Sequence, residues 1–253
     1  MNVYARLVYR NLRANLDRIT IFFELIFPLF FIFIQGYGFG GIVPPFDVGG
    51  VKLSYPLYLA AGAVTLTVIN SGTNAGTQLW YDRKNGMFEQ ILMGPFNRAQ
   101  YIFSIILATL IIGIAGSLLV FLLALPVLGF SLALSFNGVL IVASALFLGT
   151  VFYGAVAIAL SVALRSSETF QIVSTFVFFV FLFTSTVFFP SGKAPEPIRT
   201  ISLLNPLTYT TDAFRAGLFN AWTPTVGLEL PALAAEAAVM FVVAVLAFRR
   251  IRV

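Results

Sequence analysis

The sequence predicts an all-α membrane protein with six transmembrane helices. Its 253 residues are 59% hydrophobic and only 10% charged, and the mean hydropathy is +0.96. A soluble globular domain carries about 25% charged residues, so a water-soluble fold of this length could not bury so much apolar surface. Six apolar stretches come close to the about 20 residues that one helix needs to cross a bilayer.

The composition excludes several classes of function. Cysteine and histidine are both absent, which excludes disulfide frameworks, Cys/His metal sites, cysteine nucleophiles and histidine general bases. Most hydrolytic enzymes are removed with them, and no metal site is expected. The net charge of +5 does not indicate a nucleic-acid partner, because the basic residues lie between or outside the apolar stretches and leave no soluble basic face.

Residues 1–18 are expected to form an amphipathic helix at the membrane interface. Apolar residues share one face of this helix, and four arginines lie on the others. A basic amphipathic helix beside a span usually lies in the interface, with its arginines near anionic headgroups. The alternative, an ordinary cytoplasmic helix, would need a soluble domain to pack on. The two sets are Val3, Leu7, Val8, Leu12 and Leu16, and Arg6, Arg10, Arg13 and Arg18.

A single membrane domain, residues 19–248, is expected to hold the six spans, and a short tail, 249–253, follows it. Pro28 lies inside the first span, where it removes a backbone hydrogen bond and favours a kink. The second span is unusually polar and the fifth is rich in phenylalanine. There is no convincing internal repeat, which counts against an inverted-repeat secondary transporter. The spans are expected at about 19–35, 57–81, 99–127, 138–164, 170–189 and 231–248.

The basic residues are distributed unequally between the two sides of this domain. The N-terminus, the second and fourth loops and the C-terminus carry eleven of the 15 lysines and arginines, and the other loops carry four. Loops rich in lysine and arginine tend to stay in the cytoplasm. Both termini are therefore expected in the cytoplasm, which agrees with an even number of spans. The expected location is the cell (inner or plasma) membrane, crossed several times.

The cytoplasmic segment 82–98 has the pattern of a short helix between two spans. Its apolar residues recur at helical spacing, and Gly94-Pro95 would end the helix before the third span. Such a helix could push on a partner, because displacing it would tilt both spans together. It could equally pack against its own bundle, and the spacing does not decide between the two. The apolar residues are Phe88, Ile91, Leu92 and Phe96.

The external segment 190–230 carries signals for two short helices. Pro195 and Pro197 suit a helix start, and Asn205-Pro206 breaks the chain before a second helix over 207–219. Asp212 and Arg215 are three residues apart and can form an ion pair. Two amphipathic half-helices after a span indicate a re-entrant or interfacial hairpin, which can plug the outer mouth of a pathway.

These two segments resemble motifs of the ABC-2 type permeases. Residues 83–98, with Gly86, Phe88-Glu89, Leu92 and Gly94-Pro95, resemble that family's E-x-G-T-x-E-x-L-x-x-T-P loop. Phe189-Pro190, Asn205-Pro206-Leu207-Thr208-Tyr209, Asp212 and Arg215 are similar to its FP…NPLTY…D…R signature before the last helix. Met87-Phe88 stands where the family usually has a threonine before the glutamate, so a more apolar coupling contact is expected. The resemblance covers essentially the whole chain.

The resemblance implies a homodimer of permeases with two copies of a separately encoded ABC ATPase subunit docked on the loop 82–97. ATP and Mg2+ would be bound by that partner, and no cofactor by this chain. A phosphate loop is missing here, since the Gly192-Lys193 pair is followed by Ala194. The chain is therefore expected to be the non-enzymatic permease subunit of an exporter for a hydrophobic or amphipathic compound: a drug, a lipid or a lipid-linked glycan.

The resemblance also implies roles for particular residues on the two sides of the membrane. Contacts with the ATPase are expected from one set, and an external gate from the other. The coupling residues are Gly86, Phe88, Glu89, Ile91, Leu92 and Phe96, and the gate residues are Asn205, Pro206, Tyr209, Asp212 and Arg215.

A substrate pathway is expected between the second and fifth spans, where the family places its dimer cavity. Asn70 and Asn74 lie one turn apart on the second span and could form a polar lining, although Gly72 and Gly76 in a GxxxG spacing also allow plain close packing. On the fifth span a stripe of rings could line an apolar cavity, and core packing is the alternative for each ring. The stripe consists of Phe176, Phe179 and Phe183.

Glu24 is an acid inside the first span, and intramembrane carboxylates are costly and often functional. It lies about two turns after Arg18, so pairing with a basic neighbour is the alternative to a role in transport. Two other classes of protein compete with the permease interpretation. An ion-gradient-driven secondary transporter or channel would need several ionisable groups in mid-membrane, and a Ser–His intramembrane protease is impossible without histidine.

Overall fold

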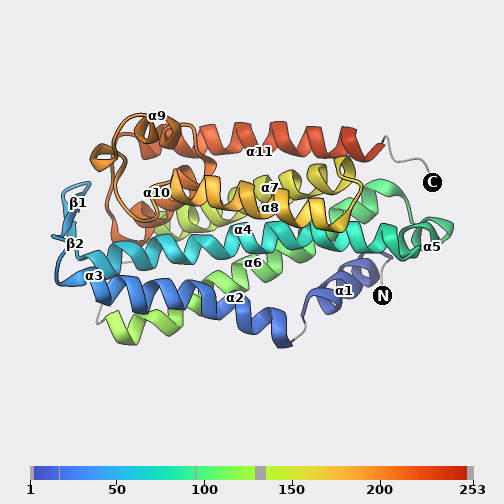
Figure 1. The fold of residues 1–253 in the computed structure, drawn as a ribbon, viewed down its shortest axis with the longest axis horizontal. Helices are drawn as coiled ribbons and strands as arrows, with labels where there is room; N and C mark the ends of the chain where they lie inside the picture. Colours follow the sequence, from blue (N-terminus) through green and yellow to red (C-terminus); the bar gives the residue numbers. More distant parts are fainter. Residues whose placement is uncertain (1–2, 17, 95, 129–134, 250–253) are drawn as a thin grey trace.

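The computed structural model describes residues 3–16, 18–94, 96–128 and 135–249, most of which are helical (Figure 1). Of the predicted features, Pro95 and residues 250–253 of the tail lie outside the described residues, and so does the side chain of Leu92. The elements in chain order are α1 (Val3–Asn15), α2 (Arg18–Phe30), a π-helical segment (Phe31–Tyr37), α3 (Gly38–Gly40), β1 (Phe46–Val48), β2 (Val51–Leu53), α4 (Tyr55–Lys84), α5 (Met87–Met93), α6 (Arg98–Leu128), α7 (Phe136–Ala163), α8 (Ser167–Phe183), a 3₁₀ turn (Ser191–Lys193), α9 (Ile198–Ser202), α10 (Pro206–Phe219) and α11 (Val226–Arg249).

The long helices lie side by side along the long axis of the molecule, with α4 packed against α6, α7 and α10 (Figure 1). α1, α5 and the last turn of α11 lie at one end, which we call the α5 end. The β1–β2 hairpin and α9 lie at the other end, the α9 end (Figure 1). The short helix of the segment 82–98 and the first helix of the segment 190–230 are thus at opposite ends of the bundle, as expected for opposite sides of a membrane.

Within the part of the chain that the structure describes, four helical stretches are long and apolar enough to cross a membrane: 21–40, 100–126, 136–163 and 226–249. α4 has 30 residues but is more polar than these, and α8 is apolar but has only 17 residues. The helical class with several candidate spans is confirmed, whereas the count of six spans stays a prediction.

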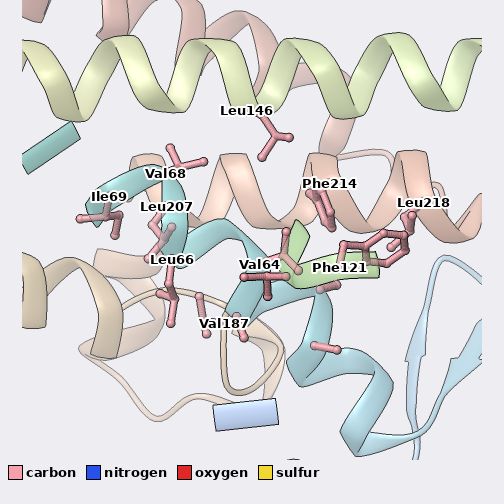
Figure 2. Packing of buried hydrophobic residues seen from close by; sticks show 14 of the residues in the cluster. Val64, Leu66, Val68, Ile69, Phe121, Leu146, Val187, Leu207, Phe214 and Leu218 are labelled. Carbon is pink, nitrogen blue, oxygen red and sulfur yellow. The ribbon is translucent and has the colours of Figure 1, made fainter. Parts of the chain in front are cut away.

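The polarity of α4 is explained by its central position. The Thr65 hydroxyl lies 2.8 Å from that of Thr211 on α10, and Thr67 is hydrogen-bonded to Ser117 on α6. Hydroxyl groups paired in this way can be buried between helices. Apolar side chains of α4 fill the remaining space against α6, α7 and α10, where Figure 2 shows Phe121, Leu146, Leu207, Phe214 and Leu218.

The GxxxG spacing of α4 serves close packing against α7. A Cβ added at Gly72 would lie 2.6 Å from the Tyr153 Cβ, and one added at Gly76 would collide with the Ala157 carbonyl. Small residues let helix backbones approach in this way. The close-packing interpretation is therefore the one that the structure supports for these two glycines.

The first predicted span is interrupted near its middle. Pro28 lies inside α2, and the α-helix gives way to the π-helical segment three residues later. A β-hairpin follows where a plain loop was expected; its turn contains Gly49 and Gly50, with φ of 59° and 82°. Such angles favour glycine and are typical of two-residue hairpin turns. The three-residue strands are too short for a sequence pattern to reveal them.

α8 ends at Phe183, six residues before the predicted end at Phe189. The carbonyl of Thr186 accepts a hydrogen bond from the Tyr58 hydroxyl, and the carbonyl of Val187 accepts one from Arg215. Both carbonyls are thus used by side chains from other helices. The predicted boundary was wrong because hydropathy alone cannot show these contacts.

α1 is attached to the bundle through one polar face. Asn11 is fully buried; it donates to Ser104 on α6 and accepts from Gln78 on α4. Arg10 forms an ion pair with Asp82, near the end of α4. Leu7 is buried beside them, whereas Leu16 is 50% exposed. α1 therefore packs on α4 and α6, and its position at a membrane interface stays a prediction.

Candidate functional site

Asn205 joins the end of α8 to the start of α10. Its side-chain oxygen accepts from the Leu207 amide and caps α10, and Pro206 occupies the first turn, where its missing N–H costs nothing. The amide nitrogen of the same side chain donates to the carbonyl of Phe181 and to the Thr184 hydroxyl, both at 2.8–2.9 Å. A helix lies where the second helix was predicted, and it begins one residue earlier than expected, at Pro206.

Arg215 is the centre of a buried polar cluster. Its guanidinium is fully buried, donates to Asp212 at 3.0 Å and donates to the carbonyls of Tyr58 and Val187. It also lies 3.5 Å from the centre of the Tyr58 ring. The predicted Asp212–Arg215 pair is therefore present, and Asp212 also accepts from Thr186. A buried charge is tolerated when it is paired and hydrogen-bonded in this way.

α10 is buried on almost all sides and is not the amphipathic half-helix that was expected. It lies against α4, α7 and α11. Tyr209 donates to the Leu203 carbonyl at 2.5 Å and so joins α10 to the turn after α9. α9 has only five residues; Ile201 within it and Leu204 just after it are exposed. Of the five predicted gate residues, Asn205, Tyr209, Asp212 and Arg215 thus tie α10 to α4, α8 and the chain before it, and Pro206 starts the helix.

A second candidate site is a cavity of about 500 Å³ between α2, α4 and α8. Glu24, Asn70 and Asn74 all line it, and Asn74 donates to the Glu24 carboxylate at 2.5 Å. The structure thus brings together an acid of the first span and the two amides predicted for the substrate pathway. The full lining is Ile19, Phe23, Glu24, Phe27, Asn70, Thr73, Asn74, Gln171, Ser174, Thr175, Phe178 and Phe179.

The predicted phenylalanine stripe of α8 lies mainly on the outside of the chain. Phe176, Phe179 and Phe183 are 67%, 44% and 56% exposed. Of the three, Phe179 reaches the cavity, and it stacks on Phe183. Phe178, which was not selected from the sequence, lines the cavity and packs against Phe27.

The coupling segment forms α5 at the α5 end of the bundle. Gly86 has a φ of 68°, which favours glycine and allows the chain to turn from α4 into α5. Phe88 is 1% exposed and packs against Tyr101 and Phe248, and Ile91 is also buried. Phe88 and Ile91 therefore face the chain's own bundle, as in the alternative that the sequence left open.

The outward surface of α5 is formed by other residues. Met87 and Met93 are 40% and 81% exposed, and Glu89 and Phe96 are half-buried. Beside α5 lies a polar cleft of about 870 Å³, which also involves the link between α7 and α8. Its ionisable lining residues are Arg83, Lys84, Glu89, Arg165 and Glu168.

Several residues with possible functional roles were missed at the sequence level. Tyr58 contacts Arg215 through both its carbonyl and its ring, and no motif singled it out. Ser174 lies in the cavity wall with its hydroxyl buried and without a hydrogen-bond partner among the described residues. Glu229 and Glu236 on α11 each have one buried carboxyl oxygen in the same condition. Glu236 could have been found as an acid inside the last predicted span.

The molecule is a bundle of apolar helices with a cavity between α2, α4 and α8 and with a short helix, α5, at one end. This arrangement suits a membrane transport protein. The profile of the ABC-2 type transporter family matches residues 3–219. The chain therefore belongs to the ABC-2 type transporter family and is a transport permease. Such a permease is a transmembrane subunit that works with an ATPase partner.

Two relatives illustrate the similarity. A protein of Porphyra purpurea named "Putative transport permease ycf38" is 27% identical over 225 residues, which cover 84% of this chain and 75% of that protein. A protein of the same name from Cyanophora paradoxa is 27% identical over 204 residues, which cover 78% of this chain and 67% of that protein.

Proposed function

We propose that the chain is the permease subunit of an ABC exporter that moves a hydrophobic or amphipathic compound out of the cytoplasm or the inner leaflet. The compound is a drug, a lipid or a lipid-linked glycan. The observation that carries the proposal is α5, a short helix held between α4 and α6 beside a polar cleft. A partner that moves α5 also moves two long helices, one of which lines the cavity.

In this proposal the α5 end faces the cytoplasm. Arg83, Lys84 and Arg165 lie in the cleft at this end, and basic residues favour the cytoplasmic side. Two ATPase subunits dock there, bind ATP and Mg2+, and act on a homodimer of this chain in the cell membrane. The exposed rings of α8 support a homodimer, because a second copy could cover them.

The docking surface consists of the outward side of α5 and the cleft beside it. Phe88 and Ile91 support this surface from behind, and Met87 and Met93 face outward. Glu89 lines the cleft beside α5, so a donor of the partner could contact its side chain there. In this proposal the chain is still coupled to the ATPase through α5, but Phe88 and Ile91 act by anchoring the inner face of the helix to the bundle. The full set of coupling residues remains Gly86, Phe88, Glu89, Ile91, Leu92 and Phe96.

Met93→Asp tests this docking surface. The side chain is 81% exposed, so the change should leave the permease folded while it places an unpaired charge in an apolar contact. We expect at least a tenfold loss of ATPase binding in a pull-down at matched expression, with transport lost in parallel. Leu204→Asp is a matched change at an exposed site of the α9 end and should leave ATPase binding unchanged. Full binding by Met93→Asp would exclude α5 as the docking helix.

A specific observation also favours a second candidate, ion-gradient-driven transport. Glu229 and Glu236 lie seven residues apart on α11, and each has a buried carboxyl oxygen without a hydrogen-bond partner among the described residues. Buried carboxyl groups in membrane helices frequently belong to ion pathways. Transport in vesicles that continues without ATP and stops with a protonophore would favour this candidate.

A further inference from the structure

The first long apolar helix of the chain is buried in its second half only. Pro28, Ile32 and Gly36 are all buried, and because they lie four residues apart they share one face of the chain that leaves α2 and enters the π-helical segment. From Arg18 to Phe27, in contrast, every described residue is partly or largely exposed. The part of α2 before Pro28 is therefore less firmly embedded in the bundle than the part that follows.

The π-helical segment is packed closely against its neighbours. A Cβ added at Gly36 would lie 3.3 Å from the Cα of Pro56 in the first turn of α4, which is closer than an ordinary van der Waals contact. Ile32 is fully buried in the apolar core. The ring of Phe31 lies 5.6 Å from that of Phe188, in the chain after α8. This segment is thus anchored to two other parts of the molecule.

Between the two halves the backbone has two features that interrupt an α-helix. Pro28 has no N–H, so the carbonyl of Glu24 loses its usual helical donor. Three residues later the α-helix changes into seven π-helical residues, Phe31–Tyr37. Sharp bends in helices occur at prolines and at π-helical turns, and such turns are frequent at functional sites. The two features together form a candidate hinge.

This hinge lies directly beside the part of α2 that forms the cavity wall. The wall residues of α2 all precede Pro28; they are Ile19, Phe23, Glu24 and Phe27. A rotation of this half of the helix would therefore change the width of the cavity while the π-helical segment stays in place. Phe22 lies six residues, or about 9 Å, before Pro28, so a change of about 20° in the bend would move it by about 3 Å.

We propose that residues 18–27 of α2 are a side gate of the cavity and swing about a hinge formed by Pro28 and the π-helical segment. Two contacts hold the gate in the position that the structure shows. The ring of Phe27 lies 6.1 Å from that of Phe178 on α8, and Asn74 on α4 donates to Glu24. Both contacts separate when the gate opens and admits a molecule from the membrane. The inference rests on the proposed function for what passes the gate.

Distances between spin labels test the hinge, because the sequence contains no cysteine that would compete for the label. The first label replaces either Phe22 in the side gate or Ile34 beyond Pro28, whose side chains are 56% and 59% exposed. The second label replaces Val239 on α11, which is 61% exposed and lies across the bundle from α2 (Figure 1). The full-length chain is purified with its native partners in nanodiscs, and an excess of unlabelled chain leaves one labelled copy per particle.

We expect the distance distribution of the Phe22 pair to be broader than that of the Ile34 pair by about 3 Å, the displacement that a 20° change in the bend would cause. Equal widths of the two distributions in the otherwise unchanged chain would overturn the proposal.

Pro28→Ala tests the hinge itself. The alanine supplies the missing N–H, which can bind the Glu24 carbonyl and stiffen the helix. The distribution of the Phe22 pair should then narrow to the width measured for Ile34. Pro126→Ala is the matched control, because Pro126 lies two residues before the end of α6, and it should change neither distribution. A Phe22 distribution that stays broad in Pro28→Ala would contradict the proposed hinge.

The widths of these distributions are independent of the proposed source of energy. A chain with a moving side gate that does not bind the ATPase would keep the hinge and lose the proposed function. A chain that binds the ATPase but gives equal widths for the two pairs would keep the permease function and lose the gate.

Discussion

Arg215 combines three kinds of contact in a fully buried position. It pairs with Asp212, donates to two backbone carbonyls and lies on the Tyr58 ring. A lysine could replace the charge but not the planar fork that reaches several acceptors at once. The residue therefore holds α10 to α4 and to the chain after α8, which is what an external gate would need in order to keep its shape.

Replacing Arg215 tests this role at the residue scale. Arg215→Leu leaves Asp212 and the carbonyl groups without their partner, and removing one member of a buried pair costs about 3–5 kcal/mol. We expect a clear fall in the melting temperature of the detergent-purified protein, with a smaller fall for Arg215→Lys. Arg199→Leu, at an exposed position, is the control and should melt like the unchanged protein. An unaltered melting temperature in Arg215→Leu would show that the cluster does not hold α10.

At the scale of elements, the contact between α4 and α7 depends on small residues. Gly76→Ala adds a methyl group that collides with the Ala157 carbonyl, and overpacking of this kind costs about 1–3 kcal/mol. The expected result is a lower melting temperature and a lower yield of folded protein. Gly154→Ala is the matched control on α7, because its Cβ would lie 3.9 Å from Ala75, an ordinary contact. Equal behaviour of the two variants would mean that the helices can separate to admit the methyl group.

The elements also show where sequence reasoning succeeds. The start of α10 was predicted because Asn205 and Pro206 act locally, as a cap and as a first-turn residue. The end of α8 was predicted wrongly because Tyr58 and Arg215 bind the following carbonyls from far along the chain. For α5 the spacing located the apolar face, but only packing shows that Phe88 turns inward against Phe248.

At the scale of the whole molecule, the class of fold follows from composition and the positions of charges. Both depend on many residues, so a misjudged residue changes the predicted fold class little. The cavity was predicted only in part, since Asn70 and Asn74 were selected and Ser174 and Phe178 were not. Its wall combines three helices, and the relative rotation of α2 and α8 cannot be read from the pattern of either one.

The central claim is that this permease moves its substrate with energy from a separate ATPase subunit. The most direct measurement compares ATP hydrolysis by the tagged full-length chain purified with its native partners and by the same chain after the partners are stripped off. We predict hydrolysis that accompanies the complex, is lost from the stripped chain and returns when the partner fraction is added back. ATP hydrolysis by the stripped chain, or a purified chain that transports substrate alone, would contradict the claim.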